Sequence, residues 1–423
     1  MECGYLGREA RVTSVGRSGG RSGPPRGGPR ASPCLAVSVL LIGAVLAGCA
    51  NKRDGGASSG APGTPGTPGA PGASGAPGAP VSPRSGSGPG EVRPAASLPA
   101  PDAKLPAFEA SQLLSFAPIA EGVDKPVMDD VVRLGQMLYF DPRLSGGGDV
   151  ACASCHDLGR AGADGQVIST GSKKQRGRLH TPTVLNAGGA FAQGWDARAT
   201  TIEELVVPHV TDPSIMGMPD VKRVTETLES IPAYAAAFKK AFPDETPAIS
   251  GETLGRALGG YTKRLFARAR WDRYLAGDRS LLSETELSGV AMFVEAGCTS
   301  CHQGKYLGAT QSQKLGIAKA WPPPAGTDPG RFEATKQEGD RGMFKVPTLR
   351  NVTRTAPYLH DGSVASLEEV VRLMARHQVG RELTDTQIGA IVAFLGTLTG
   401  DPPKELAAKP SLPAGGPKTP KPD

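Results

Sequence analysis

Two short motifs hold most of the residues in this sequence that could do chemistry. Both read Cys-x-x-Cys-His, the first from Cys152 to His156 and the second from Cys298 to His302. On a helical turn, residues three and four apart lie on one face, so two thiols and an imidazole can reach the same group. This pattern is typical of a c-type haem, whose vinyl groups bond the sulfurs while the histidine ligates the iron. We expect two covalent haems, held by Cys152, Cys155, Cys298 and Cys301 and ligated by His156 and His302.

A single motif of this kind could also be a redox pair or half of a zinc site. Zinc would need a second pair of cysteines or histidines close by, and each motif stands alone in its half of the chain. The other three cysteines, Cys3, Cys34 and Cys49, all precede residue 50. Cleavage of an export leader before Cys49 would remove Cys3 and Cys34 and leave Cys49 for lipid, so no cysteine pair would remain for a disulfide. The two isolated motifs therefore favour haem over zinc or a disulfide.

The first hundred residues resemble an export leader and a tether. Leu35–Gly48 is apolar but too short to span a membrane, and arginines precede it, as in a signal peptide. It ends before Cys49 in a sequence similar to the bacterial lipoprotein cleavage box, so we expect lipid on Cys49 and a location in the periplasm or cell envelope. An ordinary signal peptide and an uncleaved anchor are the alternatives. Glycine then recurs at every third position over Gly60–Pro80, a short repeat that favours a flexible tether.

The rest of the chain has helical patterns and no long alternating run that would indicate a sheet. Apolar spacing and capping boxes predict helices over Asp129–Phe140, Glu252–Leu275, Ser283–Glu295, Ser366–His377 and Thr384–Leu398. We expect an all-α fold with two cytochrome c-like domains, each carrying one haem. The expected segments are a signal peptide (1–48), a Gly/Pro/Ala-rich tether (49–105), a first domain (106–274), a second domain (275–400) and a disordered tail (401–423).

Net charge narrows the class of partner. The formal charge of the chain is +6, but most of the excess lies in the leader, tether and tail, so residues 106–400 are close to neutral. The basic composition is therefore no evidence for nucleic-acid binding, which we exclude.

Each iron also needs a sixth ligand or an open position. Six histidines occur, and the two proximal ones leave His180, His209, His360 and His377. Methionine is the other common axial ligand, and it raises the reduction potential of a haem. Spacing alone singles out none of the methionines after residue 105.

At this point the chain resembles a known family, the bacterial di-haem cytochrome c peroxidases, which has the methylamine-utilisation enzyme as a relative. The resemblance runs from about Leu134 to Gly400. It rests on FDPRLSGGG and CASCHD within 140–157, TPTVLN (181–186), WDARA (195–199), DRGMFKVPTLRNV (340–352) and APYLHDGSVASLEEVV (356–371).

The resemblance implies a division of labour between the haems. The haem on the second motif would accept electrons, with Met374 as its axial ligand, because Met374 follows His360 of the PYxHDG motif at the family's spacing. The haem on the first motif would meet peroxide, and Trp195 would lie on the electron path between them. Family members hold calcium through an Asn side chain and two carbonyls. Thr355 and Pro357 match the carbonyl positions, whereas His180 stands at the Asn position, so calcium is only a possible cofactor.

On the peroxide side the sequence departs from the family. The family uses a distal Glu with a nearby Gln and, in many members, a reversible distal His, and these positions fall on Ile215, Leu205 and Ser172. The acid–base group that peroxide cleavage needs is therefore not identified. Candidates to replace it are Glu203, Glu204, His209 and Asp212, and Met216 or Met218 could instead ligate and close the first iron.

Three functions follow as alternatives. The leading one is a peroxidase that reduces hydrogen peroxide with electrons from a small cytochrome c or copper protein, entering at the His/Met haem; members of the family commonly work as homodimers. The second is a family member that oxidises another protein or an organic substrate. The third is a non-enzymatic di-haem electron carrier, because the distal polar residues are lost.

Overall fold

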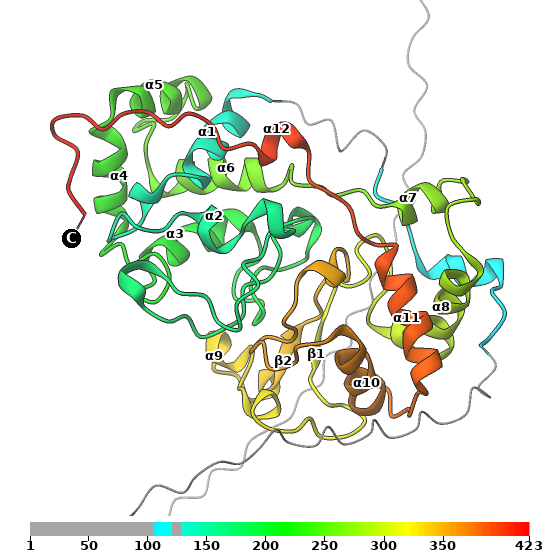
Figure 1. Ribbon diagram of the computed structural model, residues 1–423. Coiled ribbons are helices and arrows are strands. Elements are labelled where there is room, and N and C mark those ends of the chain that lie inside the picture. Colours follow the sequence, from blue (N-terminus) through cyan, green and yellow to red (C-terminus); the bar gives the residue numbers. More distant parts are fainter. Residues whose placement is uncertain (1–104, 121–127, 423) are drawn as a thin grey trace, which may run out of the picture. The chain divides into compact units, whose positions relative to one another are not determined.

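The computed structural model describes residues 105–120 and 128–422; the predicted leader, Cys49 and the glycine repeat lie outside these residues. The described chain is mostly helical (Figure 1), and none of its helices is both long and apolar enough to cross a membrane. Its α-helices are α1 (Asp130–Tyr139), α2 (Cys152–Cys155), α3 (Ile202–Thr211), α4 (Val221–Glu229), α5 (Pro232–Ala241), α6 (Gly251–Thr262), α7 (Arg270–Leu275), α8 (Glu284–Glu295), α9 (Phe332–Thr335), α10 (Leu367–Gln378), α11 (Asp385–Gly396) and α12 (Lys404–Ala407). Two short strands, β1 (Ser312–Lys314) and β2 (Met343–Lys345), pair antiparallel with Gln313 opposite Phe344.

Four of the five predicted helices are confirmed, as α1, α8, α10 and α11. Their caps explain the agreement: Asp129 accepts a hydrogen bond from the Val132 amide at 2.8 Å, and Ser283 and Glu286 form the expected capping box. The predicted single helix over Glu252–Leu275 is wrong, because the structure divides it into α6 and α7. The chain between them leaves one hydrophobic core and enters another, which a continuous helix would not allow.

Those two cores have the same helix arrangement. In the first core α6 packs against both α1 and α3, and in the second core α11 packs against both α8 and α10. A glycine allows the closest crossing in each. A Cβ on Gly135 of α1 would lie 2.0 Å from the carbonyl oxygen of Ala257 in α6, and a Cβ on Gly289 of α8 would lie 2.0 Å from that of Ala390 in α11. Neither crossing leaves room for any larger residue.

The two cores do not follow the predicted boundary at residue 275. Trp271 and Tyr274, placed in the first domain by the sequence analysis, pack in the second core. So does Phe116, just after the 3-10 helix η1 (Ala110–Ser115), and the Ile119 amide donates a 2.7 Å hydrogen bond to Asp272. The segment before α1 is thus part of the second core, although it precedes the first in the sequence.

The chain after residue 400 follows the second core in the sequence but packs on the first. The expectation of a disordered tail is therefore wrong for residues 401–422. Leu406 of α12 is fully buried in the first core. The side-chain amide of Gln136 donates to the carbonyls of Glu405, Leu406 and Ala408 at 2.7, 3.1 and 3.0 Å. Figure 1 shows this C-terminal segment running from α11 past α6 and α1 to α4. The first core provides hydrogen bonds for carbonyls of this segment and buries one large apolar side chain. The segment therefore packs in spite of its Pro- and Lys-rich composition.

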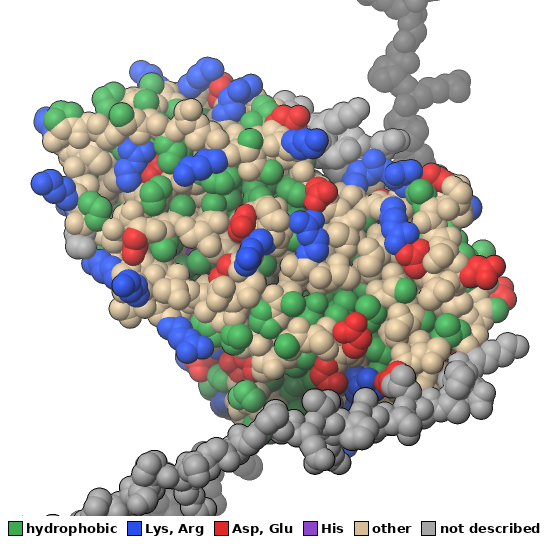
Figure 2. All heavy atoms as spheres, viewed as in Figure 1, with side chains coloured by type: hydrophobic (Ala, Val, Ile, Leu, Met, Phe, Trp, Pro, Cys, Tyr) green, Lys and Arg blue, Asp and Glu red, His purple; other side chains and the backbone are tan. Residues whose placement is uncertain are grey.

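The face of the molecule in Figure 2 carries both signs of charge. Lys and Arg side chains are spread across it with Asp and Glu between them, and apolar side chains show as patches among backbone and other side chains.

Candidate functional site

The first Cys-x-x-Cys-His motif forms the short helix α2, and His156 follows it directly. The His156 Nδ1 lies 3.1 Å from the Pro182 carbonyl oxygen and 3.3 Å from that of Gly162. A proton on Nδ1 would satisfy these carbonyls and leave Nε2 as a free electron-pair donor. Burial lowers the pKa of His156, which keeps the ring neutral and able to ligate a metal.

The second motif repeats this arrangement. Cys298–Ser300 form a turn of 3-10 helix, and His302 Nδ1 lies 3.0 Å from the Leu307 carbonyl oxygen. Burial lowers the pKa of His302 as well. Gly308, at φ +127°, lets the backbone pass close by, because a Cβ there would lie 2.1 Å from the Pro347 carbonyl oxygen. Each motif therefore holds its imidazole in one orientation through a backbone carbonyl.

One cavity of about 620 Å³ joins the two motifs. All four cysteines are free thiols, and both cysteines and the histidine of each motif line the cavity wall. Most of the lining is apolar. The combination of paired thiols, neutral imidazoles with a free Nε2 and an apolar enclosure fits a covalently attached haem at each motif.

Met374, the predicted axial ligand of the second haem, lines the same cavity from α10. The helix begins at Ser366, whose hydroxyl accepts a 3.1 Å hydrogen bond from the Glu369 amide. Its cavity-facing residues are Leu367, Val370, Val371, Met374 and Gln378, the spacing of one helical face. Met374 and His302 thus line the same cavity.

Trp195, the predicted residue on the electron path, lines the cavity and is held by a 2.9 Å hydrogen bond from its Nε1 to the His180 carbonyl oxygen. Its ring packs edge-on to the ring of His360, with centroids 6.4 Å apart. His360 in turn stacks on Phe344 of β2 at 4.1 Å. Trp195 therefore starts a run of aromatic contacts from the first half of the chain to the second.

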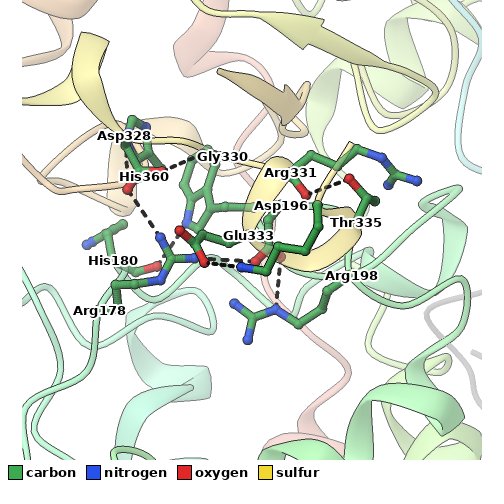
Figure 3. Close-up of polar contacts among 12 residues, drawn as sticks. Arg178, His180, Asp196, Arg198, Asp328, Gly330, Arg331, Glu333, Thr335 and His360 are labelled. Carbon is green, nitrogen blue, oxygen red and sulfur yellow. Dashed lines mark hydrogen bonds and ion pairs between the residues drawn. The ribbon is translucent and has the colours of Figure 1, made fainter. Parts of the chain in front are cut away.

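Charged residues beside this aromatic run were missed by the sequence analysis (Figure 3). Arg178 pairs with Asp196 at 3.4 Å and with Asp328 at 3.2 Å, and so joins the two halves of the chain. Arg198 donates to Asp196 at 2.9 Å, and both arginines line the cavity. Lys345, inside the DRGMFKVPTLRNV motif, also lines it, and burial lowers its pKa to about 8. Cations at a cavity wall suit the carboxylates of a haem, and the lysine within that quoted motif was the available signal.

The distal positions are apolar or turned elsewhere. Leu205 and Ile215 both line the cavity as aliphatic side chains. Ser172 does not line it; its hydroxyl donates to Asp149 at 2.8 Å and accepts from the Gly147 amide at 2.9 Å. The structure therefore provides no carboxylate at the position where the resemblance expects one.

The candidates to replace the distal acid–base group differ in whether they line the cavity. Glu203 forms an ion pair with Lys263 at 2.5 Å, and Glu204 accepts from the Thr200 hydroxyl at 2.6 Å, so neither faces the cavity. Asp212 lines the cavity, but one of its oxygens accepts from the Ser214 amide and hydroxyl at 2.8 and 2.7 Å.

His209 also lines the cavity. Burial, with the fields of His156 and Arg198, lowers its pKa to about 4, against the opposing effect of Asp212. The ring is therefore neutral at ordinary pH. Of the methionines that could close the first iron, Met216 lines the cavity and Met218 is buried away from it.

The positions that the resemblance assigns to calcium, His180, Thr355 and Pro357, all line the cavity. The His180 Nδ1 lies 2.8 Å from the Gln166 carbonyl oxygen. Among the described residues, no three His, Cys, Asp or Glu side chains gather as a metal site. Calcium stays a prediction from the resemblance.

Several known proteins are similar to this chain. Residues 129–280 match the family described as di-haem cytochrome c peroxidase. Cytochrome c551 peroxidase of Nitrosomonas europaea is 39% identical over 66% of this chain and 82% of its own length, and the methylamine utilization protein MauG of Methylorubrum extorquens is 33% identical over 66% and 80%. A solved structure of a MauG-like protein associated with microbial copper homeostasis has a TM-score of 0.58 at 28% identity, over 72% of this chain and 96% of that one. With both haem-binding motifs on one cavity and relatives of this similarity, the chain belongs to the di-haem cytochrome c peroxidase family.

Proposed function

We propose that this protein is a di-haem peroxidase that reduces hydrogen peroxide to water with electrons from a small cytochrome c or copper protein. The observation that carries the proposal is the single cavity lined by both Cys-x-x-Cys-His motifs, by Met374 and by Trp195. The names of the relatives, cytochrome c551 peroxidases among them, support the same reaction class.

When bound, the two haems supply the redox centres, and the residues of the chain orient and separate them. His156 and His302, each oriented by a backbone carbonyl, would ligate the two irons. Met374 would give the second haem the higher potential, because a thioether favours ferrous iron. Electrons would enter there and pass by the aromatic run of Phe344, His360 and Trp195 toward the first haem.

We also propose that the protein works in the periplasm or cell envelope, held by lipid on Cys49 and the tether that follows it. The apolar Leu35–Gly48 and the cleavage-box sequence before Cys49 support this location. Labelling with a radioactive fatty acid, compared between the wild type and Cys49→Ala, tests it, and equal labelling would contradict it.

A second candidate, oxidation of a protein or organic substrate, is favoured by one observation. The cavity wall has aliphatic Leu205 and Ile215 where cleavage of peroxide would profit from a carboxylate. The MauG-named relatives and the MauG-like solved structure show that the family includes members named for other roles.

The test uses the full-length protein with both haems attached and reduced cytochrome c as donor. Peroxide-dependent oxidation of the donor, lost in Cys152→Ala/Cys155→Ala, is the expected result. Turnover only with an organic substrate such as a catechol would favour the second candidate. Two haems that react with neither would indicate an electron carrier and overturn the proposal.

A further inference from the structure

Helices α3 and α10 begin with corresponding sequences, although they lie in different cores. Each begins after a hydroxyl cap, Thr201 or Ser366, whose oxygen accepts a 3.1 Å hydrogen bond from the amide three residues later. The sequences that follow are Ile-Glu-Glu-Leu-Val and Leu-Glu-Glu-Val-Val. The two helices therefore share a hydroxyl cap and a similar first five residues.

Their surroundings correspond as well. In the first core α3 packs on α6, which is crossed by α1 at Gly135; in the second core α10 packs on α11, which is crossed by α8 at Gly289. The motif with Cys152 follows α1, and the motif with Cys298 follows α8. The same three helices therefore accompany each Cys-x-x-Cys-His motif, and equivalent residues of α3 and α10 have equivalent places beside it.

Both helices turn the same face to the cavity, with residues one, four, five and eight positions after the cap. The first three of these are aliphatic in both helices: Ile202, Leu205 and Val206 in α3, and Leu367, Val370 and Val371 in α10. The eighth position is His209 in α3 and Met374 in α10. In each helix the eighth position thus bears the one side chain of the four that could ligate iron.

We propose that His209 is the second axial ligand of the first haem iron, on the side opposite His156. The inference rests on the proposed function only in requiring a haem on Cys152 and Cys155. Met374 has the corresponding place in α10 beside the second motif, and we assign His209 of α3 the corresponding role beside the first.

The bonding of the histidines supports this assignment. Among the described residues, His209 has no hydrogen-bond or ion-pair partner, whereas His156, His180, His302 and His377 each place Nδ1 near a backbone carbonyl and His360 lies 3.9 Å from Asp328. The partly buried ring of His209 lines the cavity, so it is free to bind a group held there. Asp212 lines the same cavity, and one of its oxygens is taken by the Ser214 amide and hydroxyl.

This ligation would close the first haem in its resting state. Peroxide would bind only after the imidazole had left the iron, and the released ring would remain as a neutral proton acceptor beside it. Ser172, which cannot ligate, would then be irrelevant to gating, because the closing group belongs to α3.

The test is spectroscopy of the ferric, full-length protein with both haems attached. Optical and EPR spectra of the wild type should show two low-spin haems, and His209→Gly should convert one of the two to high-spin. Cyanide should bind the first haem of the variant at least about tenfold faster than that of the wild type, because no ligand has to leave first. Added imidazole should restore the low-spin spectrum of His209→Gly.

Glu204→Gln, an exposed change on the same helix, and Met216→Leu, a change of the other possible ligand, are the matched controls and should keep the wild-type spectrum. If His209→Gly does not fold, His209→Met preserves the helix and replaces the imidazole by a thioether, which should change the low-spin EPR signal. A high-spin first haem in the wild type, unchanged spectra in both His209 variants, or a loss of ligation in Met216→Leu would each overturn the proposal.

Haem content and peroxide turnover measured on the same samples separate this proposal from the function. Two c-type haems with normal turnover and an unchanged His209→Gly spectrum would overturn the ligation alone. If the wild type has two low-spin haems and His209→Gly has only one, the ligation is supported. If the same samples show no peroxide turnover under any condition, the proposed peroxidase function is overturned.

Discussion

The first half of the described chain packs α1, α3 and α6 beside Cys152, and the second packs α8, α10 and α11 beside Cys298. Caps, crossing glycines and aliphatic cavity faces are shared between them. The halves differ where α3 has His209 and α10 has Met374. If His209 and Met374 are the ligands we propose, a common helical frame would hold two haems while one side chain in each half adjusts the chemistry, an imidazole favouring ferric and a thioether favouring ferrous iron.

The most direct way to break this difference is His209→Met, which gives α3 the side chain of α10. We expect the reduction potential of the first haem to rise by on the order of 0.2 V, a part of the roughly 0.8 V over which axial ligands tune haem. A spectroelectrochemical titration measures it. A potential that stays at the wild-type value would show that His209 is not a ligand.

The reciprocal change, Met374→Gly, removes the thioether from the second half. The potential of the second haem should fall by on the order of 0.1 V, since thioether ligation is what raises it. The same titration reports both haems, so the first serves as an internal control. If only the first haem shifted, Met374 would belong to that haem and the assignment of the halves would be reversed.

Each core contains a residue from a segment outside its own half of the chain: Leu406 packs in the first core and Phe116 in the second. Shortening these side chains tests the two cores separately. Leu406→Ala should destabilise the first core by about 3 kcal/mol, and Phe116→Ala the second by a similar amount, through lost burial and the cavity left behind. Urea unfolding followed separately at the two haems measures each core. Exposed Leu114→Ala is the control. Equal loss at both haems from one substitution would show that the cores unfold as one unit.

The two glycine crossings test whether the frame is equally tight in both halves. Gly135→Ala and Gly289→Ala should each cost about 2 kcal/mol, because the new Cβ would meet a backbone carbonyl at 2.0 Å and the helices must separate. Thermal unfolding of the two variants measures the cost, and Gly389→Ala, where a Cβ meets nothing, is the control. A difference of several degrees between the two variants would show that one crossing can yield.

The smallest expected effect concerns a buried carboxylate of the first core. Although burial opposes it, hydrogen bonds from Arg143 and Tyr234 lower the pKa of Asp141, and the Tyr234 hydroxyl donates to it at 2.6 Å. A lowered folded pKa stabilises the protein above about pH 4, the ordinary value for Asp, and this stabilisation is lost as the pH falls through the folded pKa. Tyr234→Phe should therefore cost about 1 kcal/mol at pH 7 and less at pH 3. A cost that grows toward low pH would contradict this.

The sequence predicted what local chemistry decides. Asp129 and Ser283 mark helix starts that the structure confirms, because a cap acts within one turn. The burial of Leu406 could not be predicted, since it depends on three carbonyls meeting Gln136, some 270 positions away. The pairing of Arg178 with Asp328 is equally non-local.

The site was predictable to the same extent. The spacing of cysteines and histidine identifies the two motifs from the sequence alone, whereas the place of Lys345 at the cavity is seen only in the structure. His209 could have been singled out earlier by aligning Thr201-Ile-Glu-Glu with Ser366-Leu-Glu-Glu, because the two segments place the eighth residue alike.

The exchange of segments also sets the order in which the halves can be completed during synthesis. The second core includes Phe116, which has already been synthesised when the rest of that core is made. The first core needs Leu406, which is made only after nearly all of the second core. The core beside Cys152 and Cys155 therefore cannot be completed until residue 406 has joined it, whereas the core beside Cys298 and Cys301 needs only a segment that precedes it in the chain.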